Sequence, residues 1–192
     1  MGKIKNWIME QWKDKRFRLL FAGTILLMFC LGVEFYLFKY AMTKVIRYLL
    51  VVVALFIIAW IDSKEKRIPN KILLWMIIVR FVILCVECFL YKEYWSSLIM
   101  SAVLGFLLAG GMFLFCYVVT KGGIGAGDVK LFSVLGLYTG GSAIFSVIFL
   151  TVLFAAIYNG IKLLCKKTDL KQEIPFAPFI FWGTIVAMAL GM

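Results

Sequence analysis

Residues 121–141 read KGGIGAGDVKLFSVLGLYTGG, and this stretch decides how the chain can fold. Its four glycines between residues 122 and 127 permit positive φ and a close approach of other backbone. The apolar run that follows, from Val129 to Tyr138, is about 10 residues long, whereas a membrane crossing needs about 20. We therefore predict a half-length helix that begins at Asp128 and turns at the pair Gly140-Gly141. Irregular backbone at membrane depth is tolerated only where protein buries it or water reaches it, so the glycine loop indicates a hydrated cavity.

The overall composition indicates that most of the chain lies in a membrane. Of its 192 residues, 64% are hydrophobic and 16% are charged, whereas about a quarter of the residues in soluble domains are charged. A chain of this size cannot bury so many apolar side chains in water, so the excess must face lipid. This excludes an ordinary soluble, fibrous or disordered protein. The sequence also lacks histidine, which excludes imidazole catalysis and histidine-ligated metals, and we expect neither a metal nor a cofactor.

Six further apolar runs are long enough, or nearly so, to cross a membrane. They cover residues 17–38, 45–61, 72–90, 96–120, 143–164 and 176–192. We predict an all-α fold, a polytopic transmembrane helix bundle with about six full spans plus the short half-helix. The first run is too long for a typical signal-peptide core, and no small-x-small cleavage site follows it, so we expect it to be retained. The chain then divides into a basic N-terminus with the first helix (1–44) and one helical membrane domain (45–192).

The basic residues predict the orientation of these spans. Most of the 21 Lys and Arg residues precede the first span or lie in loops on the same side, which the positive-inside rule identifies as cytoplasmic. The basic residues in loops on the other side are Lys39, Lys44, Arg47 and Lys92. We therefore expect a cytoplasmic N-terminus and basic loops that contact the anionic inner leaflet of the lipid bilayer. These contacts account for the net charge of +11 without a nucleic-acid partner.

A second break in the apolar pattern lies at residues 60–70, WIDSKEKRIPN. A helix ends at Asp62, and Pro69 opens the next helix. The missing N–H of a proline costs nothing there, because the first N–H groups of a helix have no partner within it. The predicted topology brings Asp62 and Asp128 to the same side of the membrane at a similar depth. Two carboxyl groups within reach of each other share a proton, so one can accept a proton from water while the other donates to a peptide carbonyl. Either Asp alone is more often a helix cap or an interfacial charge, and the assignment of acid and base stays open.

Two other features lie inside the predicted spans. Cys85 and Cys88 have the spacing of a metal or redox pair, but the apolar run continues on both sides and no second such pair follows. We interpret them as packing residues. Arg80 lies near the middle of its span, where a buried guanidinium needs a partner, and Glu34 and Glu87 are both candidates.

Three blocks of the sequence resemble the signature blocks of the type IV prepilin peptidases, a family of bacterial GxGD-type intramembrane aspartic proteases. The first block is Asp62 with residues 66–70 (KRIPN), the second is residues 125–131 (GAGDVKL), and the third is residues 174–179 (IPFAPF) with Gly183. The resemblance extends from Val45 to the C-terminus in the family's order and spacing. It implies that Asp62 and Asp128 are the catalytic pair.

The resemblance also marks residues that form or support the site, namely Gly125, Gly127, Lys130, Arg67, Pro69, Asn70, Pro175 and Pro178. Pro175 and Pro178 either keep the start of the last helix irregular, with backbone groups free near the site, or are simply two prolines before a helix. Lys130 and Arg67 either adjust the ionisation of the carboxyl pair and hold the substrate, or are ordinary cytoplasmic loop charges.

The function that the resemblance implies is removal of the basic leader from type IV prepilins or pseudopilins, at the cytoplasmic face of the bacterial inner membrane. Larger members carry a cytosolic insert with two CxxC pairs that is associated with N-methylation. No such insert precedes Val45, so the resemblance is to the short, peptidase-only forms. The alternative is an ion- or proton-coupled membrane transporter, which also has broken helices and membrane acids. A transporter would place its acids near mid-membrane and usually show related halves.

Overall fold

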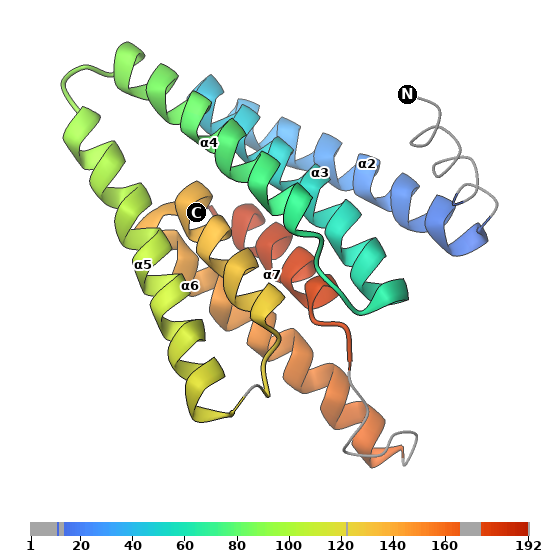
Figure 1. Ribbon diagram of the computed structural model, residues 1–192. Helices are drawn as coiled ribbons and strands as arrows, with labels where there is room; N and C mark the ends of the chain where they lie inside the picture. Colours follow the sequence, from blue (N-terminus) through green and yellow to red (C-terminus); the bar gives the residue numbers. More distant parts are fainter. Residues whose placement is uncertain (1–10, 12–13, 122, 166–173, 192) are drawn as a thin grey trace. The chain divides into compact units, whose positions relative to one another are not determined.

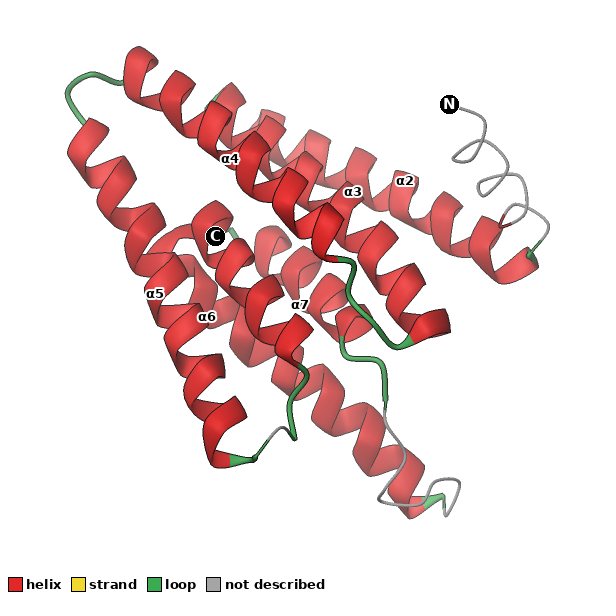
Figure 2. Cartoon of the chain, in the orientation of Figure 1, coloured by secondary structure: helices red, strands yellow, loops and turns green. Residues whose placement is uncertain are grey.

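The computed structural model describes residues 11, 14–121, 123–165 and 174–191 (Figure 1). The basic residues at positions 3, 5, 13, 166, 167 and 171, on which part of the orientation prediction depends, lie outside these ranges. The described part of the chain is helical and holds no strand, as Figure 2 shows. Its helices are α2 (Lys15–Leu37), α3 (Met42–Glu65), α4 (Asn70–Leu90), α5 (Trp95–Val119), α6 (Ala126–Leu164) and α7 (Ala177–Ala189).

The helices from α2 to α6 are each long and apolar enough to cross a membrane. Their outward faces carry large apolar side chains, including Phe81, Phe89 and Leu107, which are more than half exposed and suited to lipid. The prediction of a polytopic helix bundle is therefore confirmed, and the chain is a multi-pass membrane protein. The last helix, α7, has 13 residues, fewer than the about 20 of a straight crossing.

The chain forms two compact units, Met1–Tyr40 and Ala41–Met192. In the first unit, α2 contains an internal hydrogen bond from Thr24 Oγ1 to Leu20 O, and the ring of Phe35 stacks edge-on against Tyr40 just after the helix. The second unit contains α3 to α7 and all the residues of the three sequence blocks. The division at residues 44 and 45, which was made on motifs, stays a prediction.

Helix α6 is broken at Gly140, whose φ of 83° and ψ of 173° are not helical. Such backbone angles are essentially confined to glycine. The chain reverses there, so α6 consists of a first arm (126–139) and a second arm (141–164) that run in opposite directions (Figure 1). The first arm is roughly 20 Å long at the α-helical rise of 1.5 Å per residue. The predicted half-length helix with a turn at the glycine pair is therefore confirmed, although it begins two residues earlier, at Ala126.

The first arm of α6 forms the centre of the second unit. Every residue from Leu131 to Gly136 is buried. On one side, α5 packs against the arm through Ala102, Gly105, Ala109 and Phe113, which recur every three to four residues on a single helix face. The backbones of Gly105 and Gly136 meet directly, and a Cβ atom on either residue would overlap the other. Small residues of this kind let membrane helices approach closely, which fixes the arm against α5.

The connections of the second unit gather at its two ends. The α3–α4 loop, the α5–α6 loop and the start of α7 lie at one end, which we call the loop end (Figure 1). The α4–α5 connection lies at the opposite end. The second arm of α6 returns to the loop end, where the ring of Tyr158 contacts Phe179 at the start of α7. The three sequence blocks are therefore brought to one end of the bundle by the reversal at Gly140.

Candidate active site

Asp62 lies in the last turn of α3, and its side chain is buried although it carries a carboxyl group. Only 5% of Asp62 is exposed. Its Oδ2 atom accepts a hydrogen bond of 3.0 Å from the backbone N–H of Ala177 in the first turn of α7. The free N–H groups at a helix N-terminus are suited to a carboxylate, because they carry a partial positive charge. This hydrogen bond joins the first sequence block to the third.

The local sequence explains why the Ala177 N–H can donate to an acceptor outside its own helix. Pro175 and Pro178 flank it closely and have no N–H, and the N–H groups of Phe179 and Ile180 both donate to Phe176 O. Pro178 is tolerated because it lies in the first turn of α7, where the N–H has no partner within the helix. The first turn of α7 therefore directs the Ala177 N–H to Asp62 rather than to its own helix.

Asp128 lies in the first turn of α6 and is partly buried. Its backbone N–H donates to Gly125 O at 3.0 Å, and its carboxylate accepts a hydrogen bond from the Gly125 backbone N–H. The contact between the Asp128 carboxylate and the Gly125 N–H is one half of a capping box, with Gly125 as the N-cap residue, and glycine has no side chain to form the other half. A Cβ atom at Gly125 would lie 2.9 Å from Asp128 Oδ2, so a larger residue there would press on the carboxylate.

The two carboxyl groups lie near enough for a direct coulombic interaction between Asp62 and Asp128. They come from helix ends that are far apart in the sequence, and both belong to the loop end of the second unit. In general, two acids that approach closely titrate as a coupled pair, because ionisation of one opposes ionisation of the other. Chemically, such a pair can hold and transfer one proton.

The α3–α4 loop packs directly on the glycine loop. Gly127 lies against Ile68, such that a Cβ atom at residue 127 would be 3.1 Å from Ile68 Cβ. Beside this contact, Lys130 Nζ donates to Asn70 Oδ1 at 3.3 Å. Pro69 was predicted to open this helix and is its N-cap residue, one position before α4 begins at Asn70. The structure thus brings Gly127, Lys130, Pro69 and Asn70 together, where the end of the α3–α4 loop and the start of α4 meet the first turns of α6.

Arg67 is the predicted support residue that points elsewhere. Its guanidinium pairs with Glu65 at 2.6 Å, and the side chain of Arg67 is 76% exposed. An exposed ion pair of this kind contributes about 0–1 kcal/mol to stability. The local pair occupies Arg67 at the surface, and a role toward the carboxyl groups stays a prediction.

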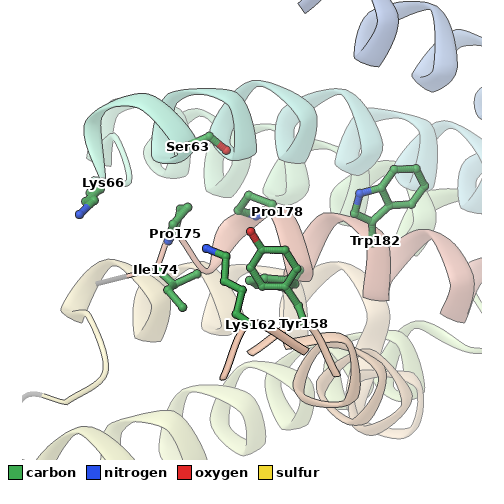
Figure 3. A pocket seen from close by; sticks show the side chains of 9 residues that line it. Ser63, Lys66, Tyr158, Lys162, Ile174, Pro175, Pro178 and Trp182 are labelled. Atoms are coloured by element: carbon green, nitrogen blue, oxygen red, sulfur yellow. The ribbon is translucent and has the colours of Figure 1, made fainter. Parts of the chain in front are cut away.

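A cavity of about 510 Å³ opens beside the Asp62 end of α3. Figure 3 shows side chains that line it from three elements: the end of α3, the second arm of α6 and the start of α7. They are Ser63, Lys66, Tyr158, Lys162, Ile174, Pro175, Pro178, Phe179 and Trp182. Pro175 and Pro178 therefore border both the Asp62 hydrogen bond and the cavity. The sequence blocks did not indicate Tyr158, Lys162 or Trp182. Tyr158 and Lys162 lie four residues apart on one face near the end of α6, whereas Trp182, in the middle of α7, has no local signal.

The buried charge of Arg80 has a partner in α4 itself. Arg80 Nη1 donates to Glu87 Oε2 at 2.7 Å, and Arg47 of α3 donates to Glu87 Oε1 at 3.2 Å. Of the two candidates that the sequence offered, Glu87 is thus the partner. Cys85 and Cys88 are both free thiols, and among the described residues no group of Cys, Asp and Glu gathers that could hold a metal ion.

Fold and site together define a multi-pass membrane protein with a pair of carboxyl groups at one end of its helix bundle. The model of the type IV leader peptidase family matches residues 48–160, which include Asp62 and Asp128. The chain therefore belongs to the type IV leader peptidase family.

Curated relatives agree with this membership. The chain is 34% identical over 140 residues to the prepilin leader peptidase/N-methyltransferase of Bacillus subtilis (strain 168), a match that covers 71% of the chain and 52% of that relative. It is 30% identical over 146 residues to the protein of the same name from Xanthomonas campestris pv. campestris, covering 69% of the chain and 49% of the relative. The chain thus spans about half the length of the curated relatives it matches. No solved structure matches the chain significantly.

Proposed function

We propose that this chain is an intramembrane aspartic endopeptidase that removes the leader peptide from type IV prepilins or pseudopilins. The observation that carries the proposal is that Asp62, in the last turn of α3, and Asp128, in the first turn of α6, lie at the same end of the bundle, where the charge of Asp62 acts on the Asp128 carboxyl. Family membership supports a peptidase. The aspartic mechanism is our inference from the two carboxyl groups.

The carboxyl pair supplies both proton transfers that peptide hydrolysis needs. One carboxylate accepts a proton from a water molecule, and the water oxygen bonds to the carbonyl carbon of the scissile peptide while the other carboxyl donates its proton to the carbonyl oxygen. The C–N bond then breaks as the leaving nitrogen receives a proton from the pair. Asp62 and Asp128 each accept a backbone N–H, so hydrogen bonding does not distinguish the acid from the base.

The relatives and the cavity support the proposed substrate class. Relatives of this chain are named prepilin leader peptidase. The cavity beside Asp62 has apolar walls from Phe179 and Trp182 and cationic residues, Lys66 and Lys162, at its border. An extended segment at the boundary of an apolar helix fits such a mixed lining, because part of it leaves lipid and part meets water. We infer that the site faces the cytoplasm of a bacterial inner membrane, with a cytoplasmic N-terminus.

Substitution of either acid tests the proposed function. We expect Asp62→Asn and Asp128→Asn each to abolish cleavage of a co-expressed prepilin, because an amide can neither accept nor donate the required proton. The measurement is the ratio of uncut to cut prepilin on a gel, with the amount of each variant in the membrane fraction determined by immunoblot.

The matched control is Glu65→Gln, which changes an acid three residues from Asp62 that pairs with Arg67 at the surface. This variant should cleave at the wild-type rate. The resemblance implies that the cut follows a glycine of the prepilin, so a prepilin with a bulky residue in its place should remain uncut by the wild-type chain. Normal processing by either Asn variant, at normal membrane levels, would refute the proposal.

The transporter alternative fits the structure less well. Asp62 lies in the last turn of α3 and Asp128 in the first turn of α6, so both acids are at helix ends rather than at mid-span. The segments around the two acids are the loops and helix starts that contain the three sequence blocks. This arrangement serves a reaction at the water boundary better than a path through the bilayer centre.

A further inference from the structure

A chain of buried polar contacts links the two Asp-bearing helices at the end of the bundle that is far from the acids. It begins at Arg47 on α3, the helix that carries Asp62, and passes to Glu87 on α4 at 3.2 Å. From Glu87 it passes to Arg80 at 2.7 Å, also on α4. Arg80 Nε then donates to the backbone carbonyl of Leu137 at 2.8 Å, near the end of the first arm of α6. That arm begins with the turn that carries Asp128.

The contact between Arg80 and Leu137 has the character of a helix C-cap. The first arm ends at the Gly140 break, and the last four carbonyl groups of a helix lack partners within it. A cation at this end also interacts favourably with the helix dipole. Tyr138 adds a second tie to α4, since its hydroxyl donates to Met76 O at 2.7 Å. The buried guanidinium of Arg80 thus satisfies a carbonyl that the half-helix exposes at membrane depth.

Removing the charged groups of these contacts from water costs free energy, which argues that the contacts have a use beyond stability. The side chains of Arg80 and Glu87 are 4% and 3% exposed, and that of Arg47 is 13% exposed, so three charged groups are largely removed from water. A buried ion pair is often no more stabilising than apolar residues of similar volume, and its best-attested use is to fix the register of packed helices. Here the helices in register are those that carry Asp62 and Asp128.

We propose that Arg47, Glu87 and Arg80 form a positioning chain that sets the depth and rotation of the Asp128 arm relative to Asp62. The first arm is buried from Leu131 to Gly136 and packed against α5, so a fixed far end constrains the position of its near end. The same α4 helix holds the near end through Asn70 and Lys130. Arg80 is thus a positioning residue for the carboxyl pair, and this inference rests on the proposed function.

The test compares loss of charge with loss of packing. In the triple variant Arg47→Met, Glu87→Leu and Arg80→Met, apolar side chains replace the three charges, so the fold should persist at wild-type levels. We expect kcat for prepilin cleavage to fall about tenfold or more with KM within about twofold of wild type, because small displacements of catalytic groups cost rate rather than binding. The single variant Arg80→Gln should likewise lower kcat about tenfold or more with KM within about twofold of wild type. Met76→Leu, a buried change on the same face of α4, is the control and should leave kcat unchanged.

A second readout needs no substrate. In a background without native cysteines, Asn70→Cys with Lys130→Cys should be joined efficiently by a short bifunctional thiol reagent, since the native side chains lie 3.3 Å apart. Addition of the triple change should lower the cross-linked fraction at least threefold. If the triple variant keeps kcat within threefold and cross-links as before, the positioning chain is refuted.

The two readouts separate this inference from the proposed function. A wild-type chain that fails to cleave prepilin refutes the proposed function, and the cross-linked fraction then decides on the positioning chain alone. If Arg80→Gln does not accumulate, Arg80→Lys replaces it. Lysine has one nitrogen in place of Nε and Nη1, so it cannot keep the contacts to Leu137 O and Glu87 at their present geometry. We therefore expect kcat to fall threefold or more, and wild-type kcat in Arg80→Lys would count against the chain.

Discussion

At the scale of single residues, the site depends on close contacts that leave no room for a larger side chain. Gly127 lies against Ile68, and Gly125 lies against the carboxylate of Asp128. These contacts set the position of the turn from which Asp128 projects. Gly125 and Gly127 are therefore required by packing rather than by backbone conformation, since neither has a positive φ.

A substitution at Gly127 tests this packing. Gly127→Val would force Ile68 and the α3–α4 loop away from the turn, since even a Cβ atom there would lie 3.1 Å from Ile68 Cβ. We expect the cleavage rate per membrane-inserted molecule to fall about tenfold or more, because misplacement of a catalytic group by about 1 Å has effects up to 10²-fold. The control is Ala126→Val, an exposed neighbour that should keep the wild-type rate. A Gly127→Val variant with full activity would show that this contact does not position Asp128.

Sequence reasoning at this scale reached the acids but not their partners. Asp62 was predicted as a site residue because it precedes a break in an apolar run, and Asp128 because it follows one. The donor to Asp62, the Ala177 N–H, is 115 residues away and is set by the packing of α7 on α3, which no local pattern reports. For Arg67 the sequence reasoning failed in another way. Its side chain forms a surface ion pair with Glu65, only two residues away, and the motif does not report this local pairing.

At the scale of elements, the reversal at Gly140 is the feature that builds the site. It returns the second arm of α6 to the loop end, where Tyr158 and Lys162 line the cavity with the start of α7. The sequence predicted this turn because an apolar run of half-span length precedes a glycine pair. It could not choose between Glu34 and Glu87 as the partner of Arg80, because Glu34 lies on another helix, α2, and local sequence does not report which side chains of separate helices meet.

Gly140→Ala tests the reversal. Glycine adopts a φ of 83° with a ψ of 173° without strain, whereas alanine held in this conformation would cost about 1–3 kcal/mol of stability. The added methyl would also meet Ser101. We expect the thermal unfolding midpoint of the detergent-solubilised chain to fall accordingly.

The control for this change is Gly111→Ala in α5, where a Cβ atom would meet nothing within 4 Å. Because alanine favours a helix over glycine by about 1 kcal/mol, this variant should be equally or more stable than the wild type. Equal stability of the Gly140→Ala and Gly111→Ala variants would contradict the assigned turn.

At the scale of the whole molecule, composition and length were enough to predict an all-helical membrane bundle, because only helices satisfy every backbone group within one span in lipid. Helix bounds differ from the predicted runs by a few residues at most ends, where polar residues extend the helices beyond their apolar parts. The orientation in the membrane rests on the distribution of basic residues and is open to direct measurement.

Cysteine labelling measures that orientation. In a cysteine-free background, Lys66→Cys in the α3–α4 loop should react with a membrane-impermeant thiol reagent only after the cells are permeabilised. Lys92→Cys, in the α4–α5 connection, should react in intact cells. Both positions are exposed in the structure, so each is the control for the other. The reverse pattern would invert the topology and remove the site from the cytoplasm.

The most direct measurement of the central claim is the initial rate of prepilin cleavage by the purified chain in lipid vesicles, for Asp62→Asn, Asp128→Asn and the double variant. If the two carboxyls act as one unit, each single change should lower the rate by about 10²–10⁴-fold, and the double change should lower it no further. Retention of more than a tenth of the wild-type rate by either single variant, or multiplied losses in the double variant, would contradict an aspartic pair.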